Sequence, residues 1–398
     1  MMEDVFATAP LHHVSVPRAT GKAAADVLSP RDSAQAWEEI TAWQGYAPTP
    51  LVDLAGLARQ IDVGAIHYKD EGPRFGLGSF KALGGAYAAL RVLARELSRR
   101  LGRAVPLAEI RQGRHRDGCA RITLVSATDG NHGRSLAWGC QRFGARCRIY
   151  IHAEVSEGRA AAMRELGADV VRIAGDYDAS VRLARDEAEA NGWFVVSDTS
   201  WDGYTEPPRD VMAGYGVMTR EICAALRSPP THVFVQGGVG GLAAAVAAGL
   251  RQHYGGDAPR VVIVEPDRAA CLFESAVAGR PTPVAIAAET IMAGLSCGEP
   301  SELAWQILRE EAGDFLTIPD ALVAPTVRLL ARSAFADPAV EAGESAVAGL
   351  AALIAARQSA ALSAALGLDA GSRVLAIGSE GVTDPAIFAA IMEGEGGA

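Results

Sequence analysis

Lysine is scarce in this 398-residue chain, which contains only Lys22, Lys69 and Lys81 against many arginines. A guanidinium can replace an amine at a solvated surface, but it cannot condense with an aldehyde to form a Schiff base. Lys81 lies in the glycine-flanked segment 78–85. It is therefore a candidate covalent anchor, although it can equally be an ordinary residue that stayed lysine.

Other absences narrow the class of protein. No apolar run approaches the ~18 residues of a membrane span, and the net charge of −10 argues against a nucleic-acid or anionic-membrane surface. Residues 1–4 include Glu3 and Asp4 and no apolar run follows them, so we expect no signal peptide. The six cysteines form no CxxC or zinc pattern, so we expect free thiols, no metal site and a cytoplasmic location. The spacing leaves a Cys271–Cys297 pair open.

What is present is an α/β pattern. With 49% hydrophobic residues the chain has ample core, and its length suggests two or three domains. Short β-branched runs alternate with alanine-rich stretches, which indicates mostly parallel sheets covered by helices. The expected strands are 65–69, 122–126, 147–151, 170–173, 194–197, 233–236, 261–265 and 374–377. The expected helices include 82–95, 156–166, 242–252 and 343–366, with Gly167 and Gly367 as stop signals.

Segment 101–120 interrupts this pattern with several arginines, and we expect a solvated loop without a binding role there. Lys81 itself precedes the expected helix 82–95, with Ser79 as a candidate N-cap. A lysine on the first turn of a helix has its pKa lowered by the helix dipole, which favours an amine nucleophile.

A second motif, 126–133, follows an expected strand at the edge where ligands of α/β folds gather. Thr128, Asp129, Gly130 and His132 are candidates for binding a carboxylate at the next helix N-terminus. The alternative is a polar strand-to-helix turn, and His132 is more easily understood as a structural hydrogen-bonding residue than as a catalyst.

A third motif is a glycine-rich loop after strand 233–236, suited to binding a phosphate with backbone N–H groups. Its candidate residues are Gly237, Gly238, Val239, Gly240 and Gly241. The same residues also fit a dinucleotide fingerprint, with Glu265 at the end of the following strand as the ribose ligand. The sequence of the loop alone does not decide between a phosphate site and a dinucleotide site.

Two further strand ends carry polar residues. Asp198 is a candidate acid or base in segment 197–204, or else a local cap. Ser379, in segment 378–381, offers a small hydroxyl to a ligand edge, or else caps a turn. A pyridoxal phosphate enzyme uses every one of these motifs, with Lys81 on the aldehyde, whereas a nicotinamide enzyme explains the glycine loop alone.

In order and spacing, the motifs around Lys81, 128–132, 237–241 and 378–381 resemble the fold-type II pyridoxal phosphate enzymes over roughly residues 45–390. That group includes threonine and serine dehydratases, cysteine synthases and tryptophan synthase β. The resemblance implies two open, twisted, mostly parallel α/β domains with the cofactor in the cleft. It also implies that Ser379 meets the pyridine nitrogen and that Asn131 lies beside the 3-hydroxyl of the ring.

Asp129 narrows the resemblance, because the dehydratases usually carry a small neutral residue there. An aspartate at this position, with segments 75–78, 198–205 and 289–300, is similar to the diaminopropionate ammonia-lyases. This implies a homodimeric lyase that converts the D and L isomers of 2,3-diaminopropionate to pyruvate and two ammonia molecules. Asp129 would be the base for the D isomer and Asp198 for the L isomer, although the released Lys81 amine could serve instead of Asp198.

By the same analogy, residues 1–86 and 216–398 would form a large cofactor-binding domain, and 87–215 a small inserted one. The nearest alternative is a serine, threonine or hydroxyaspartate dehydratase. A more distant one is a nucleotide-dependent oxidoreductase, which rests on the glycine loop and Glu265. A binding protein that has lost the chemistry is a third, and the intact candidate residues argue against it.

Overall fold

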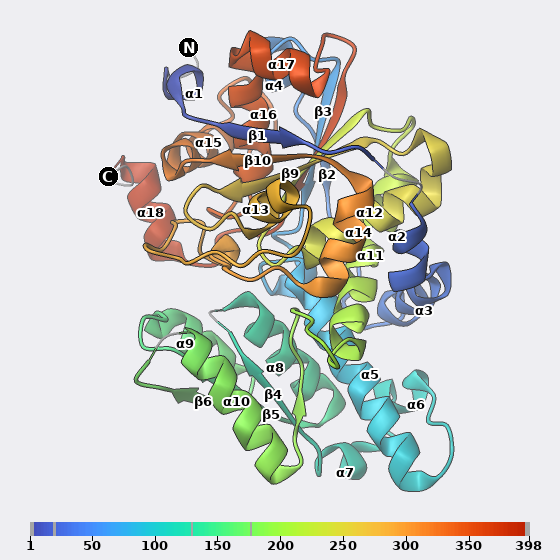
Figure 1. The fold of residues 1–398 in the computed structure, drawn as a ribbon. Helices are drawn as coiled ribbons and strands as arrows, with labels where there is room; N and C mark the ends of the chain where they lie inside the picture. The colour runs from blue at the N-terminus through green and yellow to red at the C-terminus, as the bar shows by residue number, and fades with distance from the viewer. Residues whose placement is uncertain (1–3, 19–20, 129, 176, 395–398) are drawn as a thin grey trace. The chain divides into compact units, whose positions relative to one another are not determined.

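The computed structural model describes residues 4–18, 21–128, 130–175 and 177–394. The chain forms two compact units, each with its own sheet. The first unit comprises Met1–Pro30, Pro48–Phe80 and Met218–Ala398, and the second comprises Arg31–Ala47 and Lys81–Val217. Both sheets have helices beside them (Figure 1), which confirms the α/β class.

The first unit is built on a seven-stranded sheet in the order β1-β10-β9-β8-β11-β3-β2. Its strands are β1 (His12–Ser15), β2 (Leu51–Asp53), β3 (Ala65–Asp70), β8 (His232–Gln236), β9 (Arg260–Pro266), β10 (Ala312–Ile318) and β11 (Arg373–Gly378). Only the edge strands β1 and β2 run antiparallel to their neighbours. The inner strands are almost fully buried, as near-continuous apolar runs require.

The helices of the first unit are α1 (Val5–Thr8), α2 (Lys22–Val27), α4 (Ala55–Gln60), α12 (Gly241–Tyr254), α13 (Cys271–Ala278), α14 (Glu302–Glu311), α15 (Val323–Ala331), α16 (Ala348–Gln358), α17 (Ala360–Leu366) and α18 (Pro385–Glu393). Short 3-10 turns lie at Arg74–Gly76, Gly255–Asp257, Ala293–Leu295 and Asp320–Leu322. The apolar α16 packs against the four central strands β8 to β11 and supplies much of the core.

The second unit has a four-stranded parallel sheet in the order β6-β5-β4-β7. Its strands are β4 (Thr123–Ala127), β5 (Arg146–Ile151), β6 (Asp169–Arg172) and β7 (Phe194–Val195), and its helices are α3 (Pro30–Thr41), α5 (Lys81–Leu101), α6 (Leu107–Arg111), α7 (Arg116–Cys119), α8 (Asn131–Phe143), α9 (Glu157–Glu165), α10 (Tyr177–Asn191) and the first part of α11 (Glu206–Ala225). Helices α8 and α10 pack against β4 and β5.

Small residues hold α5 close to its neighbours. A Cβ on Gly84 would lie 2.3 Å from the Tyr215 ring, and one on Gly214 would lie 2.5 Å from the Leu83 carbonyl oxygen. On another side of α5, a Cβ on Gly139 would lie 2.8 Å from the Ala86 Cα. Backbones this close cannot accommodate side chains, so the helix that begins at Lys81 is tightly fixed within its unit.

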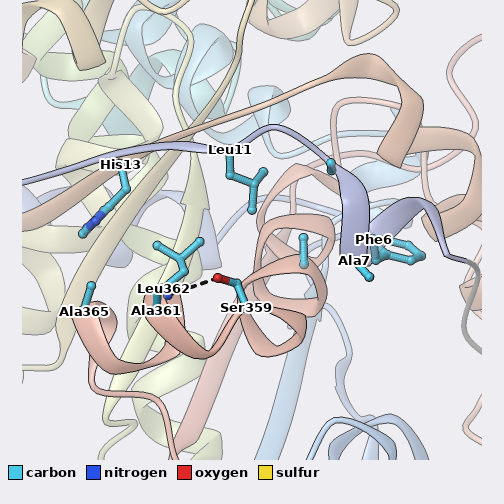
Figure 2. A pocket seen from close by; sticks show the side chains of 10 residues that line it. Phe6, Ala7, Leu11, His13, Ser359, Ala361, Leu362 and Ala365 are labelled. Atoms are coloured by element: carbon cyan, nitrogen blue, oxygen red, sulfur yellow. Dashed lines mark hydrogen bonds between the residues drawn. The ribbon is translucent and has the colours of Figure 1, made fainter.

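All eight expected strands and three of the four expected helices exist, with ends that shift by up to six residues, but two expectations were wrong. Segment 343–366 is not one helix, because the chain breaks at Ser359, whose hydroxyl accepts the Leu362 N–H and starts α17 (Figure 2). Segment 101–120 is not a plain loop but carries α6 and α7. Strands β1, β2 and β10 were not expected.

Segment 31–47, expected in the large domain, packs within the second unit. The Trp43 ring lies 5.8 Å from the rings of both Trp138 and Phe143, and Arg111 of the basic segment pairs with Glu39 at 2.9 Å. The basic segment therefore has a structural role. The division into domains at residues 87 and 215 stays a prediction.

A hollow of about 420 Å³ lies in the first unit, lined by apolar residues such as Phe6 and Leu362 and by the polar His13 and Ser359 (Figure 2). It contains none of the motif residues. In the described part of the chain, no single helix has the length and apolar character of a membrane span, and only α16 and α17 taken together, across a 117° bend, pass that test.

Candidate functional site

Lys81 is the first residue of α5, as its place in the sequence predicted. The preceding turn is unusual, since Phe75 has a φ of 50° and Gly78 a φ of 81°. Ser79 forms a bridge with Glu380, and the Phe80 N–H donates to the Ser379 carbonyl at 3.0 Å. The segment that leads to Lys81 is thus tied through its backbone to the end of β11.

Within the second unit, the Lys81 Nζ atom forms an ion pair with the Asp198 carboxylate. Asp198 lies beyond β7, and Lys81 lies 117 residues before it in the chain. A candidate amine nucleophile and a candidate base are therefore in direct contact. This contact was not predicted, because the sequence motifs placed both residues at the site without pairing them.

The loop that carries Asp198 is fixed by Tyr204. The Tyr204 hydroxyl donates to the Val195 carbonyl at 3.0 Å and accepts the Ser197 N–H at 3.0 Å. Its ring stacks on Trp201 at 4.0 Å, and the guanidinium of Arg185 lies 3.6 Å from the centre of the Trp201 ring. Tyr204 therefore holds the loop in place, a contact that its place in segment 197–204 did not predict.

The charge state of Asp198 follows from these neighbours. Burial alone would raise the pKa of Asp198, but the Lys81 amine, followed by His132, outweighs burial and holds the pKa below its usual value. Burial lowers the pKa of His132, so this imidazole is neutral near pH 7. Its Nε2 atom lies 2.9 Å from the Val196 carbonyl and must carry the proton, which leaves Nδ1 facing Asp198 at 3.9 Å.

The turn at 126–133 is closed by Thr128. Its hydroxyl accepts the N–H groups of Gly130 at 3.2 Å and Gly133 at 3.4 Å. Helix α8 then begins at Asn131, so the motif does lie at a helix N-terminus, as predicted. Asp129, which the sequence analysis proposed as a base, lies outside the described residues.

The glycine-rich loop connects β8 to α12 in the first unit. A Cβ on Gly237 would lie 2.7 Å from Leu272, and one on Gly238 would lie 3.2 Å from the Cys297 sulfur. Gly240 has a φ of 98° and begins the helix. Side chains at Gly237 and Gly238 would meet these neighbours, so the loop keeps bare backbone there, close to a helix N-terminus suited to an anion.

None of the six cysteines forms a disulfide in the structure, although Cys271 and Cys297 both lie beside the glycine loop. Among the described residues, no group of three or more histidine, cysteine or acidic side chains is arranged to hold a metal ion.

Ser379 follows β11 and lies next to the same loop. Its Oγ accepts a hydrogen bond from the Gln236 side-chain amide at 2.6 Å, and both side chains are buried. A Cβ on the preceding Gly378 would lie 2.3 Å from the buried Tyr68 ring, so only glycine fits there. Gln236 was expected as the last residue of strand 233–236, with no function assigned to it.

Glu265, the ribose ligand of the dinucleotide alternative, is engaged elsewhere. Its two carboxylate oxygens accept the N–H groups of Leu272 at 2.8 Å and Phe273 at 2.6 Å. Burial raises the pKa of Glu265 to about 8. The Glu265 side chain thus binds the first turn of α13 and is not available to a ribose. This removes the main support for the oxidoreductase alternative.

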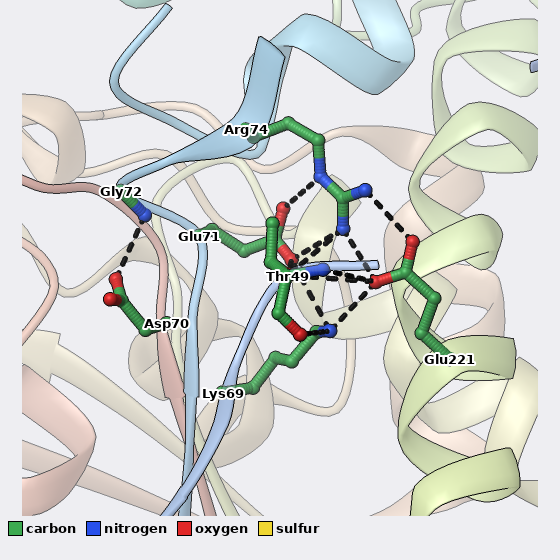
Figure 3. Close-up of polar contacts among 7 residues, drawn as sticks. All are labelled: Thr49, Lys69, Asp70, Glu71, Gly72, Arg74 and Glu221. Atoms are coloured by element: carbon green, nitrogen blue, oxygen red, sulfur yellow. Dashed lines mark hydrogen bonds and ion pairs between the residues drawn. The ribbon is translucent and has the colours of Figure 1, made fainter. Parts of the chain in front are cut away.

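Lys69, which the sequence left unexplained, belongs to a buried charged cluster with Glu71, Arg74 and Glu221 (Figure 3). Its Nζ atom lies 2.7 Å from a Glu221 oxygen and 2.8 Å from the Thr49 carbonyl. Arg74 donates to both glutamates at 2.7–2.8 Å. The cluster joins β3 and the 3-10 turn before Lys81 to the end of α11.

Known proteins resemble this chain over most of its length. Residues 42–379 match the family model described as pyridoxal-phosphate dependent enzyme. The diaminopropionate ammonia-lyase of Escherichia coli K12 is 39% identical over 348 residues, which covers 85% of this chain and 86% of that protein. A probable D-serine dehydratase of Burkholderia thailandensis is 28% identical and covers 72% of this chain and 67% of its own length.

Solved structures agree. A crystal structure of the Escherichia coli diaminopropionate ammonia-lyase, in complex with an aminoacrylate–pyridoxal phosphate azomethine intermediate, superposes with a TM-score of 0.88 at 34% identity and covers 98% of this chain and 99% of that one. A tomato threonine deaminase, at 19% identity and a TM-score of 0.71, covers 96% of this chain and 91% of its own and shares the fold alone. The chain belongs to the family of pyridoxal-phosphate-dependent enzymes of fold type II.

Proposed function

We propose that the chain is a diaminopropionate ammonia-lyase, which converts 2,3-diaminopropionate and water to pyruvate and two ammonia molecules. The observation that carries the proposal is the pairing of the Lys81 amine with an ionised Asp198 carboxylate. This pairing supports Lys81 as the proposed anchor for the cofactor and Asp198 as a proposed base beside it. The names of the relatives at 38–39% identity support the choice of substrate.

The residues fit the cofactor. The glycine loop offers backbone where a Cβ would clash, and the buried Gln236 Oε1 atom has no hydrogen-bond partner in the described protein. When bound, pyridoxal phosphate supplies an aldehyde for attachment and a ring that draws electrons from the substrate Cα–H bond. Its proposed ligands are Lys81 for the aldehyde, Gly237, Gly238, Val239, Gly240 and Gly241 for the phosphate, Ser379 for the ring nitrogen and Asn131 for the 3-hydroxyl.

The substrate carboxylate would bind at the 128–132 turn, through Thr128, Asp129, Gly130 and His132. The Thr128 hydroxyl already accepts two backbone N–H groups, so its part is to hold the turn in shape. The N-terminus of α8, a helix of 13 residues, supplies a partial positive charge suited to this anion.

Asp198 would remove the Cα proton of the L isomer. Lys81 is the largest influence that opposes burial at this carboxylate. When the Lys81 amine is no longer a cation, burial dominates, and the pKa of Asp198 rises toward values useful for a base. The ion pair therefore holds Asp198 deprotonated until the Lys81 amine loses its positive charge.

The two isomers would present this proton on opposite faces of the plane of the bound cofactor, so one carboxylate cannot reach both. Asp129 would act on the D isomer. Either carboxylate can also attract the substrate β-ammonium group, which serine and threonine lack, and this favours diaminopropionate over hydroxyl substrates. On the basis of the resemblance, we further propose a homodimer in the cytoplasm. Sedimentation of the purified protein tests the dimer.

The test is pyruvate release by the purified protein from D- and L-diaminopropionate, D- and L-serine and threonine. We expect both diaminopropionate isomers to be turned over with the highest kcat/KM. A second candidate, D-serine dehydratase, is favoured by the relatives of about 28% identity. It would replace the proposal if D-serine were the best substrate.

Lys81→Arg tests the anchor in the same assay. The guanidinium cannot form the covalent link, so the variant should lose both pyruvate release and the visible absorbance of the bound cofactor. Lys22→Arg, at a side chain that is 80% exposed, is the matched control and should keep both. A visible band that persisted in Lys81→Arg would show that the anchor lies elsewhere.

A further inference from the structure

Gln236 and Ser379 are brought together by the sheet of the first unit. Gln236 is the last residue of β8, and Ser379 directly follows β11, the neighbouring parallel strand. The Gln236 Nε2 atom donates to Ser379 Oγ at 2.6 Å, and the residues are 2% and 4% exposed. A buried contact of this length fixes both side chains.

The contact determines where the Ser379 proton can point. A serine hydroxyl has one proton and two acceptor lone pairs, whereas the NH₂ of a glutamine side chain can only donate. Ser379 therefore accepts from Gln236 and must direct its own proton elsewhere. Among the residues that the structure describes, the Ser379 side chain makes no second hydrogen bond.

The opposite end of the Gln236 side chain gives a second observation. Its Oε1 atom is buried and has no hydrogen-bond partner in the described protein. A buried carbonyl oxygen without a partner destabilises the folded protein, because the oxygen has lost its hydrogen bonds to water. The Gln236 amide is thus held in an orientation in which its NH₂ group donates to Ser379 while its oxygen has no partner among the described residues.

We propose that Gln236 is a positioning residue that keeps the Ser379 hydroxyl a hydrogen-bond donor toward the pyridine nitrogen of the cofactor. The inference rests on the proposed function, since it takes Ser379 as the partner of that nitrogen. A nitrogen that accepts a hydrogen bond stays unprotonated, and the ring withdraws electrons less strongly. Loss of the β-amino group is then favoured over transamination.

The test is the ¹⁵N chemical shift of the ring nitrogen in holoenzyme reconstituted with ¹⁵N-labelled pyridoxal phosphate. The wild type should show a neutral, hydrogen-bonded nitrogen. In Gln236→Glu the new carboxylate accepts the Ser379 proton, so the hydroxyl presents a lone pair and the nitrogen signal should move toward that of a pyridinium. More pyridoxamine phosphate per pyruvate should accompany the shift. Gln252→Glu, where the wild-type amide donates to the Leu28 carbonyl, is the control and should leave the signal unchanged.

A double-mutant cycle gives a readout that does not depend on Gln236→Glu folding. Gln236→Leu should lower kcat about tenfold in the wild type, the effect of one hydrogen bond. It should have almost no effect on kcat in a Ser379→Ala background, because Gln236 acts only through Ser379. Additive effects in the cycle, or an unchanged ¹⁵N signal in Gln236→Glu, would overturn the inference. Failure of the proposed function is distinct, since the wild type itself would then release no pyruvate from diaminopropionate.

Discussion

At the scale of single residues, the three lysines show three uses of one side chain. Lys22 is exposed and lies 3.9 Å from Asp26, where an arginine would serve as well. Lys69 is 1% exposed and completes a charged cluster in the first unit. Lys81 is the lysine whose amine meets a carboxylate at the start of a helix. Rarity alone could not separate Lys69, which is buried, from Lys81, whose side chain is 21% exposed.

The two proposed bases give the first prediction. Asp198→Asn should lower pyruvate release from the L isomer by about 10²–10⁴-fold, the usual contribution of a general base, and affect the D isomer much less. Asp129→Asn should show the opposite preference. Steady-state pyruvate release from each pure isomer measures both. Asp202→Asn, an exposed aspartate of the same loop, is the control. Equal losses for both isomers in either variant would contradict the two-base scheme.

Tyr204 gives the second prediction. Tyr204→Phe removes the hydroxyl that links the Val195 carbonyl to the Ser197 N–H. Both residues lie in the segment that leads directly to Asp198. The ring contact with Trp201 is kept, so the loop should stay in place but position Asp198 less well. We expect kcat for the L isomer to fall about tenfold, with a smaller change for the D isomer.

The control for this variant is Tyr177→Phe, at an exposed tyrosine of the same unit. If Tyr204→Phe reduced the rates for both isomers equally, the hydroxyl would support the fold of the unit as a whole rather than the position of Asp198.

At the scale of elements, the buried charged cluster links β3, the 3-10 turn before Lys81 and α11. Burial alone would raise the pKa of Glu221, but Arg74 and Lys69 hold it below its usual value. The two acidic and two basic side chains of the cluster neutralise one another's charges. Removal of one of them therefore leaves a buried charge without an opposite charge beside it. The cluster therefore stabilises these elements only while it is complete.

A double-mutant cycle on this cluster is the third prediction. Glu221→Leu and Lys69→Met should each lower the free energy of unfolding by about 3–5 kcal/mol, and the double variant should lose less than their sum. Urea denaturation measures the three values. Lys22→Met removes an exposed ion pair and should cost less than about 1 kcal/mol. Additive losses would show that the two charges do not depend on each other.

The elements also show what the sequence could predict. Inner strands such as β8 and β9 are continuous apolar runs with a polar residue at the end, and both were predicted. Strand β10 begins Ala-Gly-Asp, which looks like a loop, and becomes a strand because parallel pairing with β9 buries it. Ser359 interrupts a long alanine-rich stretch, and its hydroxyl cap turns one expected helix into two. A serine N-cap is a local signal that was present in the sequence.

At the scale of the whole molecule, the motifs of the site could be proposed from the sequence because each is a short continuous segment, at a strand end or, for Lys81, at the start of a helix. The charged cluster and the Gln236–Ser379 contact could not, since they join residues about 150 positions apart. No local pattern specifies which acid pairs with which base over that separation. Sequence reasoning therefore proposed residues that would touch the ligand, which stays a prediction, and missed those that hold other residues in place.

The pH dependence of stability is the last prediction and belongs to the whole molecule. Burial would raise the pKa values of Glu221 and Asp314, but their basic partners hold both below the usual values. A carboxylate whose pKa is depressed in the folded state contributes stability that is present above its unfolded pKa, about 4, and is lost as the pH falls through the folded pKa. The free energy of unfolding should therefore decrease steeply below about pH 4.

Glu221→Gln tests the sign of this effect. Glutamine does not titrate, so the variant should be less stable than the wild type at pH 7, and the difference should shrink as the pH falls below about 4. Glu265, whose raised pKa of about 8 acts in the opposite direction between about pH 4 and pH 8, is present in both proteins and cancels in the comparison. Urea denaturation from pH 3 to pH 7 measures the difference, with Glu38→Gln as the exposed control. A difference that stayed constant over this range would mean that Glu221 gains nothing from being ionised in the folded protein.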